Sequence, residues 1–339
     1  MLSKCKAIVS YSHANDLDGK MSSAIVRKYC LDRNIPFYLL FGDYNTYNIE
    51  EVLKASKIIE DDRNTSRSET LLIFTDFFPT PNTEAFNLLH SHGFVNGSNM
   101  MIIDHHDTLI KTLQTVTWLP YCFVGTAGCE LTWNTLFPNR PTPIAVQLLG
   151  RYDVFDKQHQ VFSWNTICEF QWACRQWSKE TPNNLLELLE ESTAAQNGSD
   201  DTVNNGRVPL LYKTLAEGKT LFAKQKKDWK ELGKKAFRVT YNCMQTLCLN
   251  SATSNGMMFD SVRTPEDELM IVFSIAQDKQ TQKLRYNLSL YAGNDTVHAG
   301  EIARAIGNNG GGHKGVGGSQ ASVFSFNHDS ETGLHLTIQ

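Results

Sequence analysis

Several features that mark common protein classes are scarce in this sequence of 339 residues. Its 8 cysteines include no C-x-x-C pair, which argues against a structural zinc site and fits free thiols in a reducing compartment. No segment has the length and apolar character of a membrane span, and the apolar run near residue 10 is too short for a signal peptide. The net charge of −4 gives no overall attraction to nucleic acid. These absences predict a cytoplasmic protein without membrane association.

The composition is that of an ordinary globular chain, with 41% hydrophobic and 20% charged residues, and the length predicts two domains. Strand-like and helix-like segments alternate over roughly the first third of the chain, which predicts an α/β domain with a parallel sheet. The expected strands of this sheet cover residues 6–12, 37–41, 71–75 and 100–103. We expect three parts: a parallel-sheet domain at 1–180, a helical connector at 181–236 and a smaller α+β domain at 237–339.

The carboxyl-terminal part reads as a second sheet. An apolar segment at 269–275 and an alternating segment at 283–291 predict strands, and a helix is expected at 298–306. Two further strands are expected at 239–249 and 320–326.

Ionisable residues gather where the first-domain strands end. His13, Asp16 and Asp18 follow one strand, Asp76 follows another, and Asp104, His105 and His106 follow a third; Asp153 is a fourth candidate. Parallel strands bring such ends to one edge of the sheet, where open α/β folds keep their sites. Packed carboxylates and imidazoles repel or desolvate one another unless a cation holds them. Oxygen-rich ligands with one or two imidazoles suit Mn²⁺, Mg²⁺ or Fe²⁺ better than zinc, and so many ligands favour two metal ions that share a bridging carboxylate.

Each of these strings also has an alternative explanation. The segment Asp16–Gly19 is compatible with a turn in which the aspartate and glycine serve the backbone. Asp76 is compatible with a helix cap. The doublet His105–His106 between two aspartates is harder to explain in this way, and the set as a whole favours a metal site.

A second strong feature is the glycine-rich segment 307–318, in which seven of twelve residues are glycine. Glycine lets backbone N–H groups approach an anion closely, and His313 and Lys314 add donors and positive charge. We interpret the segment as a phosphate cradle, with a flexible linker as the alternative. It contains no G-K-[ST] and follows no strand, so it is neither a P-loop nor a dinucleotide fingerprint. The aromatic residues between Phe155 and Trp177 indicate core packing, with base stacking as the alternative.

The strings HANDLDG, TDFFPT, DHHDT, GRYD and GGGHKGVGG resemble, in this order, the motifs of the DHH phosphoesterase superfamily. The last string resembles its associated carboxyl-terminal domain. GTAGCELTW after the DHH string makes the chain most similar to the nano-RNase and oligoribonuclease branch. The resemblance implies a catalytic parallel-sheet domain, a smaller substrate-binding domain and an active site in the cleft between them.

The resemblance also implies roles for individual residues. His13 and Asp16 would hold one metal ion, and Asp18, His105 and Asp153 the other. Asp76 would bridge the two ions. The spacing between His13 and Asp16 departs from that of many members.

Two residues would serve catalysis. Asp104 would orient a histidine, and His106 would face the scissile phosphate. Gly311, Gly312 and His313 would grip a substrate phosphate.

These expectations describe a phosphodiesterase that uses water activated by two divalent ions, Mn²⁺ foremost and Mg²⁺ or Fe²⁺ as alternatives. Its substrates would be short oligonucleotides or small nucleotides such as cyclic dinucleotides or 3′-phosphoadenosine 5′-phosphate. The alternatives are a phosphoanhydride hydrolase acting on polyphosphate or pyrophosphate, and a nucleotide sensor without catalysis. A homodimer is left open, as is the choice between RNA and DNA.

Overall fold

The computed structural model divides the chain into two compact units, Met1–Phe222 and Ala223–Gln339. It describes residues 1–42, 47–79, 82–177, 181–196, 209–277, 282–307 and 310–339. The boundary between the units lies within helix α9 (Leu210–Gly233). The domain boundaries expected after residues 180 and 236 stay predictions, as does the expected cleft. Residues 197–208 of the expected connector lie outside the described residues.

The first unit contains a four-stranded parallel sheet in the order β2-β1-β3-β4. Its strands are β1 (Ala7–His13), β2 (Phe37–Gly42), β3 (Thr70–Thr75) and β4 (Met100–Ile103). Every residue of β3 and β4 is buried, as expected for parallel strands covered on both faces. The register pairs Ser12 with Thr75 and Thr75 with Ile103, so three strands end at the same edge. The predicted α/β class is confirmed.

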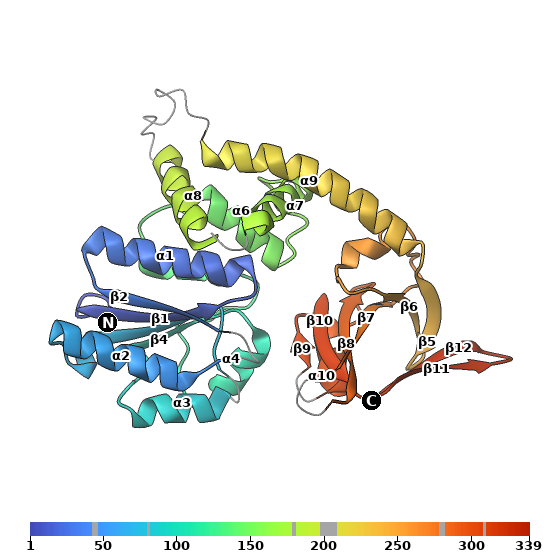
Figure 1. Cartoon of the computed structure of the whole chain (residues 1–339), viewed down its shortest axis with the longest axis horizontal. Helices are drawn as coiled ribbons and strands as arrows, with labels where there is room; N and C mark the ends of the chain where they lie inside the picture. Colours follow the sequence, from blue (N-terminus) through green and yellow to red (C-terminus); the bar gives the residue numbers. More distant parts are fainter. Residues whose placement is uncertain (43–46, 80–81, 178–180, 197–208, 278–281, 308–309) are drawn as a thin grey trace. The chain divides into compact units, whose positions relative to one another are not determined.

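Helices cover both faces of this sheet: α1 lies on one face, and α2 and α3 lie on the other (Figure 1). The helices of the unit are α1 (Leu17–Arg33), α2 (Ile49–Arg63), α3 (Asn82–Ser91), α4 (Asp107–Leu113), α5 (Gly128–Leu136), α6 (Ile144–Asp153), α7 (Trp164–Cys174) and α8 (Thr181–Gln196), with 3₁₀ turns at Arg67–Glu69 and Arg175–Trp177.

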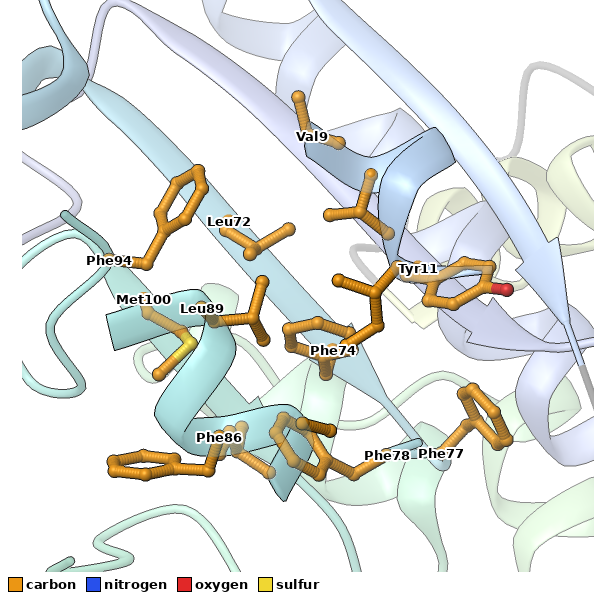
Figure 2. Packing of buried hydrophobic residues seen from close by; sticks show 14 of the residues in the cluster. Val9, Tyr11, Leu72, Phe74, Phe77, Phe78, Phe86, Leu89, Phe94 and Met100 are labelled. Carbon is orange, nitrogen blue, oxygen red and sulfur yellow. The ribbon is translucent and has the colours of Figure 1, made fainter. Parts of the chain in front are cut away.

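The core beneath α2 and α3 is built by every second residue of the strands, because successive side chains of a strand point to opposite faces. Figure 2 shows Val9 and Tyr11 of β1 and Leu72 and Phe74 of β3 packed with aromatic residues that follow β3. The ring of Phe74 lies 4.7 Å from that of Phe78, centroid to centroid, and 6.1 Å from that of Tyr11. This packing fixes the backbone that leads out of β3 toward the site.

The second unit contains an eight-stranded mixed sheet in the order β11-β12-β5-β6-β7-β8-β10-β9. Its elements are β5 (Phe237–Tyr241), β6 (Met244–Asn250), a 3₁₀ turn (Gly256–Phe259), β7 (Leu269–Gln277), β8 (Leu284–Ala292), α10 (Ala299–Ile306), β9 (Gly311–Gly312), β10 (Val316–Ala321), β11 (Phe324–Asp329) and β12 (Gly333–Ile338). Ala299 and Ala303 of α10 pack into its core.

Two predicted strands of this unit are wrong in extent. The segment 239–249 is a hairpin, because Asn242 (φ 47°) and Cys243 (φ 64°) form a two-residue turn with both residues at positive φ. The segment 320–326 spans the end of β10 and the start of β11, and the final strand β12 was not expected. Neither of these two interruptions between strands contains the glycine or proline that usually marks a turn. None of the described helices combines the length and apolar composition that crossing a bilayer requires.

Phe74→Ala tests the packing that supports the site. Phe74 is fully buried, so its truncation should lower the free energy of unfolding by about 3–5 kcal/mol. Urea denaturation measures the loss. Leu88→Ala on α3 is the matched control, because Leu88 is 43% exposed and its truncation should change stability by less than about 0.5 kcal/mol. Equal losses for the two variants would contradict the proposed core.

Candidate metal centre

The predicted ligands of the first unit meet at the carboxyl edge of its sheet. His13 is the last residue of β1, Asp76 follows the last residue of β3, and Asp104 and His105 follow β4. Asp16 is the N-cap of α1, Asp18 lies in its first turn, and Asp153 is the last residue of α6. Two groups among them place potential ligand atoms within 4.8 Å of one another.

The first group is formed by His13, Asp16 and Asp76. His13 Nδ1 lies 2.7 Å from Asp16 Oδ2 and 3.7 Å from Asp76 Oδ2. The other oxygen of Asp16 accepts a hydrogen bond from the Gly19 N–H at 2.9 Å. Asp16 therefore serves the backbone through Oδ1, as the N-cap of a helix instead of in an isolated turn, while Oδ2 faces the imidazole.

The second group is formed by Asp18, His105 and Asp153. His105 Nε2 lies 3.7 Å from Asp18 Oδ2 and 3.3 Å from Asp153 Oδ2. His105 is almost fully buried, at 1% exposure, so this imidazole nitrogen lies among carboxylates and away from solvent.

Asp76 lies between the two groups. Its Oδ2 faces His13, and its Oδ1 lies 3.2 Å from His105 Nε2. Asp76 is 1% exposed, and neither of its oxygens accepts a hydrogen bond of ordinary geometry from the described residues. It caps no described helix and has a positive φ of 54°, a conformation that aspartate tolerates better than most residues. A strained, buried carboxylate with both oxygens turned toward two ligand groups is the geometry that a bridging ligand needs.

The amino end of α5 holds Asp18 in place. The N–H groups of Gly128 and Cys129 donate to the two Asp18 oxygens at 2.7 and 2.8 Å. A β-carbon on Gly128 would lie 2.7 Å from Cβ of Asp76, so only glycine fits against both carboxylates. Gly19 has a similar constraint, because a β-carbon there would overlap the carbonyl oxygen of His13.

These supporting residues were not among the predicted site residues. The string GTAGCELTW indicates their presence only through its resemblance to the superfamily. Their contacts join residues about 110 positions apart in sequence, and no local pattern reports such a contact.

His106 is held by Asp104. Oδ1 of Asp104 accepts a hydrogen bond from the backbone N–H of His106 at 2.8 Å and lies 2.8 Å from its Nδ1. Asp104 is fully buried, whereas the side chain of His106 is 24% exposed. This pairing fixes the orientation of the ring.

Crowding of charge shifts the pKa values of the site. Burial and the neighbouring Asp18 and Asp16 raise the pKa of Asp76 well above its usual range. Burial and the charge of Asp18 raise the pKa of Asp153 to about 7. Burial opposes charging of His13, but the neighbouring carboxylates of Asp16 and Asp76 raise its pKa to about 10. Burial also opposes charging of His106, and the charge of Asp104 raises its pKa. Protons therefore neutralise this cluster when no other cation does.

The residues present fit divalent metal ions. Carboxylate oxygens and imidazole nitrogens are the donors that Mn²⁺, Mg²⁺ and Fe²⁺ accept, and the buried oxygens of Asp76 lack hydrogen-bond donors among the described residues. His13 Nδ1 and His105 Nε2 already face these carboxylates at 2.7–3.7 Å. A cation in either group would replace the protons that the cluster otherwise holds.

The glycine-rich segment lies in the second unit. Gly311 and Gly312 form β9, and Gly312 pairs with Gly317 of β10. A flexible linker therefore does not describe these residues; Asn308 and Asn309 lie outside the described residues. Gly312 has φ 137°, and a β-carbon on Gly317 would lie 2.6 Å from the carbonyl oxygen of Ala299, so close packing on α10 accounts for part of the glycine content.

The side chains of this segment remain accessible. His313 is half-buried and Lys314 is exposed. The His313 N–H donates to the carbonyl oxygen of Val316 at 2.8 Å, which fixes the backbone beneath the imidazole. Phosphate binding by Gly311, Gly312, His313 and Lys314 stays a prediction.

Comparisons with known proteins give remote structural similarity only. No family model and no curated protein match the sequence. Similar solved structures include a pGpG-specific phosphodiesterase, PggH, from Vibrio cholerae (13% identity, TM-score 0.44, covering 93% of each chain). A manganese-bound exonuclease RecJ follows at 14% identity and a TM-score of 0.41, covering 94% of this chain and 86% of that one. An exopolyphosphatase-related protein from Bacteroides fragilis has 12% identity and a TM-score of 0.42, covering 94% and 87%. Each TM-score is below 0.5, so the function proposed below depends on the ligand geometry.

Metal binding should strengthen as pH rises. A ligand must lose its proton to bind a metal ion, and Asp76, Asp153 and His13 all have raised pKa values. The apparent Kd for Mn²⁺ should therefore fall by about tenfold per pH unit for each displaced proton between pH 6 and 8. Calorimetry in two buffers of different ionisation enthalpy measures both the Kd and the protons released. Asp62→Asn, at an exposed site on α2, should reproduce the wild-type slope. A Kd that is constant across this range would contradict the assignment of these groups as ligands.

Proposed function

We propose that this protein is a metal-dependent phosphodiesterase of the DHH phosphoesterase type, which hydrolyses short oligonucleotides or related small nucleotides with two divalent ions. The observation that carries the proposal is the pair of ligand groups, His13–Asp16 and Asp18–His105–Asp153, with the buried Asp76 between them. The resemblance of the sequence to the superfamily implies the same division of ligands. Mn²⁺ is the ion proposed for the site, with Mg²⁺ and Fe²⁺ as alternatives.

When bound, two such ions supply a hydroxide nucleophile near neutral pH and neutralise charge on the phosphoryl oxygens. The residues of the chain provide the rest of the chemistry. The two ions would be held by His13, Asp16, Asp18, Asp76, His105 and Asp153. Asp104 keeps the Nδ1 side of His106 occupied, so Nε2 is the nitrogen that can donate to the substrate.

We assign His106 the role of hydrogen-bond donor to the phosphoryl group of the substrate. Its pKa is raised, because the charge of Asp104 outweighs the effect of burial, and this favours the protonated form of the ring. A protonated imidazole can donate from Nε2 to a phosphoryl oxygen while negative charge develops there. Asp104, which is fully buried, keeps this ring oriented, and its charge favours the positive form of the imidazole.

We assign the glycine-rich segment the role of binding a terminal phosphate of the substrate. The half-buried His313 and the exposed Lys314 supply donors and positive charge, and the strand pairing of Gly311 and Gly312 provides a fixed backbone. A terminal phosphate held in this way would favour short substrates over long ones.

The substrate class is tested with a panel. The purified protein is incubated with Mn²⁺ and linear dinucleotides, longer oligomers, cyclic dinucleotides, 3′-phosphoadenosine 5′-phosphate or polyphosphate, and the products are separated by chromatography. Turnover of short nucleotidic diesters above all others is expected. Turnover of polyphosphate alone would support the phosphoanhydride hydrolase, and nucleotide binding without turnover would support the sensor.

Asp76→Asn tests the bridging role without disturbing the backbone, because asparagine accepts the same positive φ. The variant should lower kcat by at least about 10³-fold at any Mn²⁺ concentration, since the two oxygens of Asp76 face His13 on one side and His105 on the other. Its melting temperature should stay within a few degrees of the wild type. Recovery of turnover at high Mn²⁺ would argue that Asp76 belongs to one ion only, and Asp62→Asn controls for the loss of a charge.

His313→Ala tests the second unit. Loss of a charged hydrogen bond to phosphate should raise KM by about tenfold and leave kcat nearly unchanged. His328→Ala, at an exposed position of β11, is the matched control and should behave as the wild type. A fall in kcat without a change in KM would place His313 in the chemical step instead.

A further inference from the structure

Beside the metal centre, the turn that follows α6 carries an exposed aromatic ring. Asp153 ends the helix, and Phe155, two residues later, is 39% exposed. Phe155 has φ 57°, a conformation that is unfavourable for a bulky side chain and suits glycine or asparagine. Its N–H donates to the carbonyl oxygen of Tyr152 at 3.1 Å, which closes the turn. The backbone gives no reason for a phenyl ring at this position.

The ring of Phe155 is the exposed member of a cluster of three aromatic rings. Tyr152, which is buried, and Trp164 of α7 are parallel within 6° at a centroid distance of 5.6 Å. Phe155 lies 5.3 Å from Trp164, at an interplanar angle of 41°. Phe155 also lies 6.4 Å from Tyr152, at an interplanar angle of 45°. The three rings therefore form a cluster in which Tyr152 is buried, Trp164 half-buried and Phe155 exposed, and the exposed ring can accept another aromatic group.

A positive charge lies beside this exposed ring. Nζ of Lys157 is 5.2 Å from the centre of the Phe155 ring and 5.9 Å from that of Trp164. Lys157 is exposed, and among the described residues no carboxylate pairs with it. An aromatic surface with an adjacent cation complements a group that has both a flat ring and a negative charge, and a nucleotide has both.

The turn is tied to the metal centre by Arg151. Nε of Arg151 donates to Oε1 of Glu130 at 3.2 Å, and Nη1 lies 3.4 Å from Oδ2 of Asp156. Glu130 belongs to α5, the helix whose first N–H groups hold Asp18. The aromatic cluster therefore has a fixed position relative to the proposed ligands Asp18 and Asp153.

From this geometry we propose that Phe155, backed by Trp164 and flanked by Lys157, is the platform on which a base of the nucleotide substrate stacks. The proposal rests on the proposed function for its substrate class. It makes Phe155 a specificity-determining residue that distinguishes nucleotides from other phosphate esters. Stacking needs only a π-face, so the platform accepts any base and favours the larger purines.

The experiment measures nucleotide binding directly. AMP is titrated calorimetrically into the wild type and into Phe155→Gly, and ribose 5-phosphate serves as the same phosphate without a base. Phe155→Gly removes the ring and suits the positive φ, so its melting temperature should not fall. Its Kd for AMP should rise by about tenfold, while that for ribose 5-phosphate stays unchanged. Phe155→Tyr should bind AMP as the wild type does, and so should the control Tyr38→Leu, since Tyr38 is 37% exposed on β2.

Tryptophan fluorescence tests whether AMP binds next to Trp164. AMP should quench tryptophan fluorescence in the wild type, and Trp164→Phe should abolish most of that quenching while retaining affinity. Unchanged AMP binding by Phe155→Gly, or equal losses for AMP and ribose 5-phosphate, would overturn the platform.

Failure of the proposed function is distinguishable from failure of the platform. If the wild type with Mn²⁺ hydrolyses no dinucleotide but Phe155→Gly still loses affinity for AMP alone, the phosphodiesterase assignment falls and the platform stands. If dinucleotides are hydrolysed with the same KM by the wild type and Phe155→Gly, the platform falls and the phosphodiesterase stands.

Discussion

At one edge of the first sheet, Asp76, which is 1% exposed, lies among the carboxylates of Asp16, Asp18 and Asp153. Desolvation and mutual repulsion oppose this arrangement, and the rest of the site offsets them. N–H groups of α5 hold Asp18, the Gly19 N–H holds one oxygen of Asp16, and two imidazoles face the remaining oxygens. The oxygens of Asp76 accept no hydrogen bond from the described residues. Divalent cations would complete this balance of charge, and they would connect the fold to the proposed chemistry.

The parallel order of the strands makes such crowding achievable. Three strands end at adjacent positions, so residues far apart in sequence meet without long loops. The helices that follow must then approach the strand ends closely. Gly19 and Gly128 allow this approach, because a side chain at either position would overlap His13 or the carboxylates. The aromatic core behind β3 in turn fixes the backbone that presents Asp76 in its positive-φ conformation (Figure 2).

Much of the first sheet follows from sequence, because fully buried parallel strands are continuous apolar runs that end in polar residues. The same signal locates His13, Asp76 and His105, although the ligand roles proposed for them depend on geometry and resemblance. Other features cannot be predicted from the neighbouring sequence. Glycine at 128 reflects a contact with Asp18, about 110 residues away. The turn at Asn242–Cys243 lacks the glycine that marks most two-residue hairpins, so two strands read as one.

At the end of α6, the residues proposed to recognise the base and those proposed to hold the metal ions belong to the same short segment. Arg151, Asp153 and Phe155 occupy alternate positions of one short segment, and each has a different partner. Arg151 binds Glu130 of α5, and α5 holds Asp18, so a shift of this segment would displace carboxylates of the second ligand group together with the exposed ring. A base resting on Phe155 would therefore be positioned by the same contacts that position the metal ligands. Rigid coupling of this kind lowers the entropic barrier to a productive complex, since the base and the phosphate are oriented by one framework.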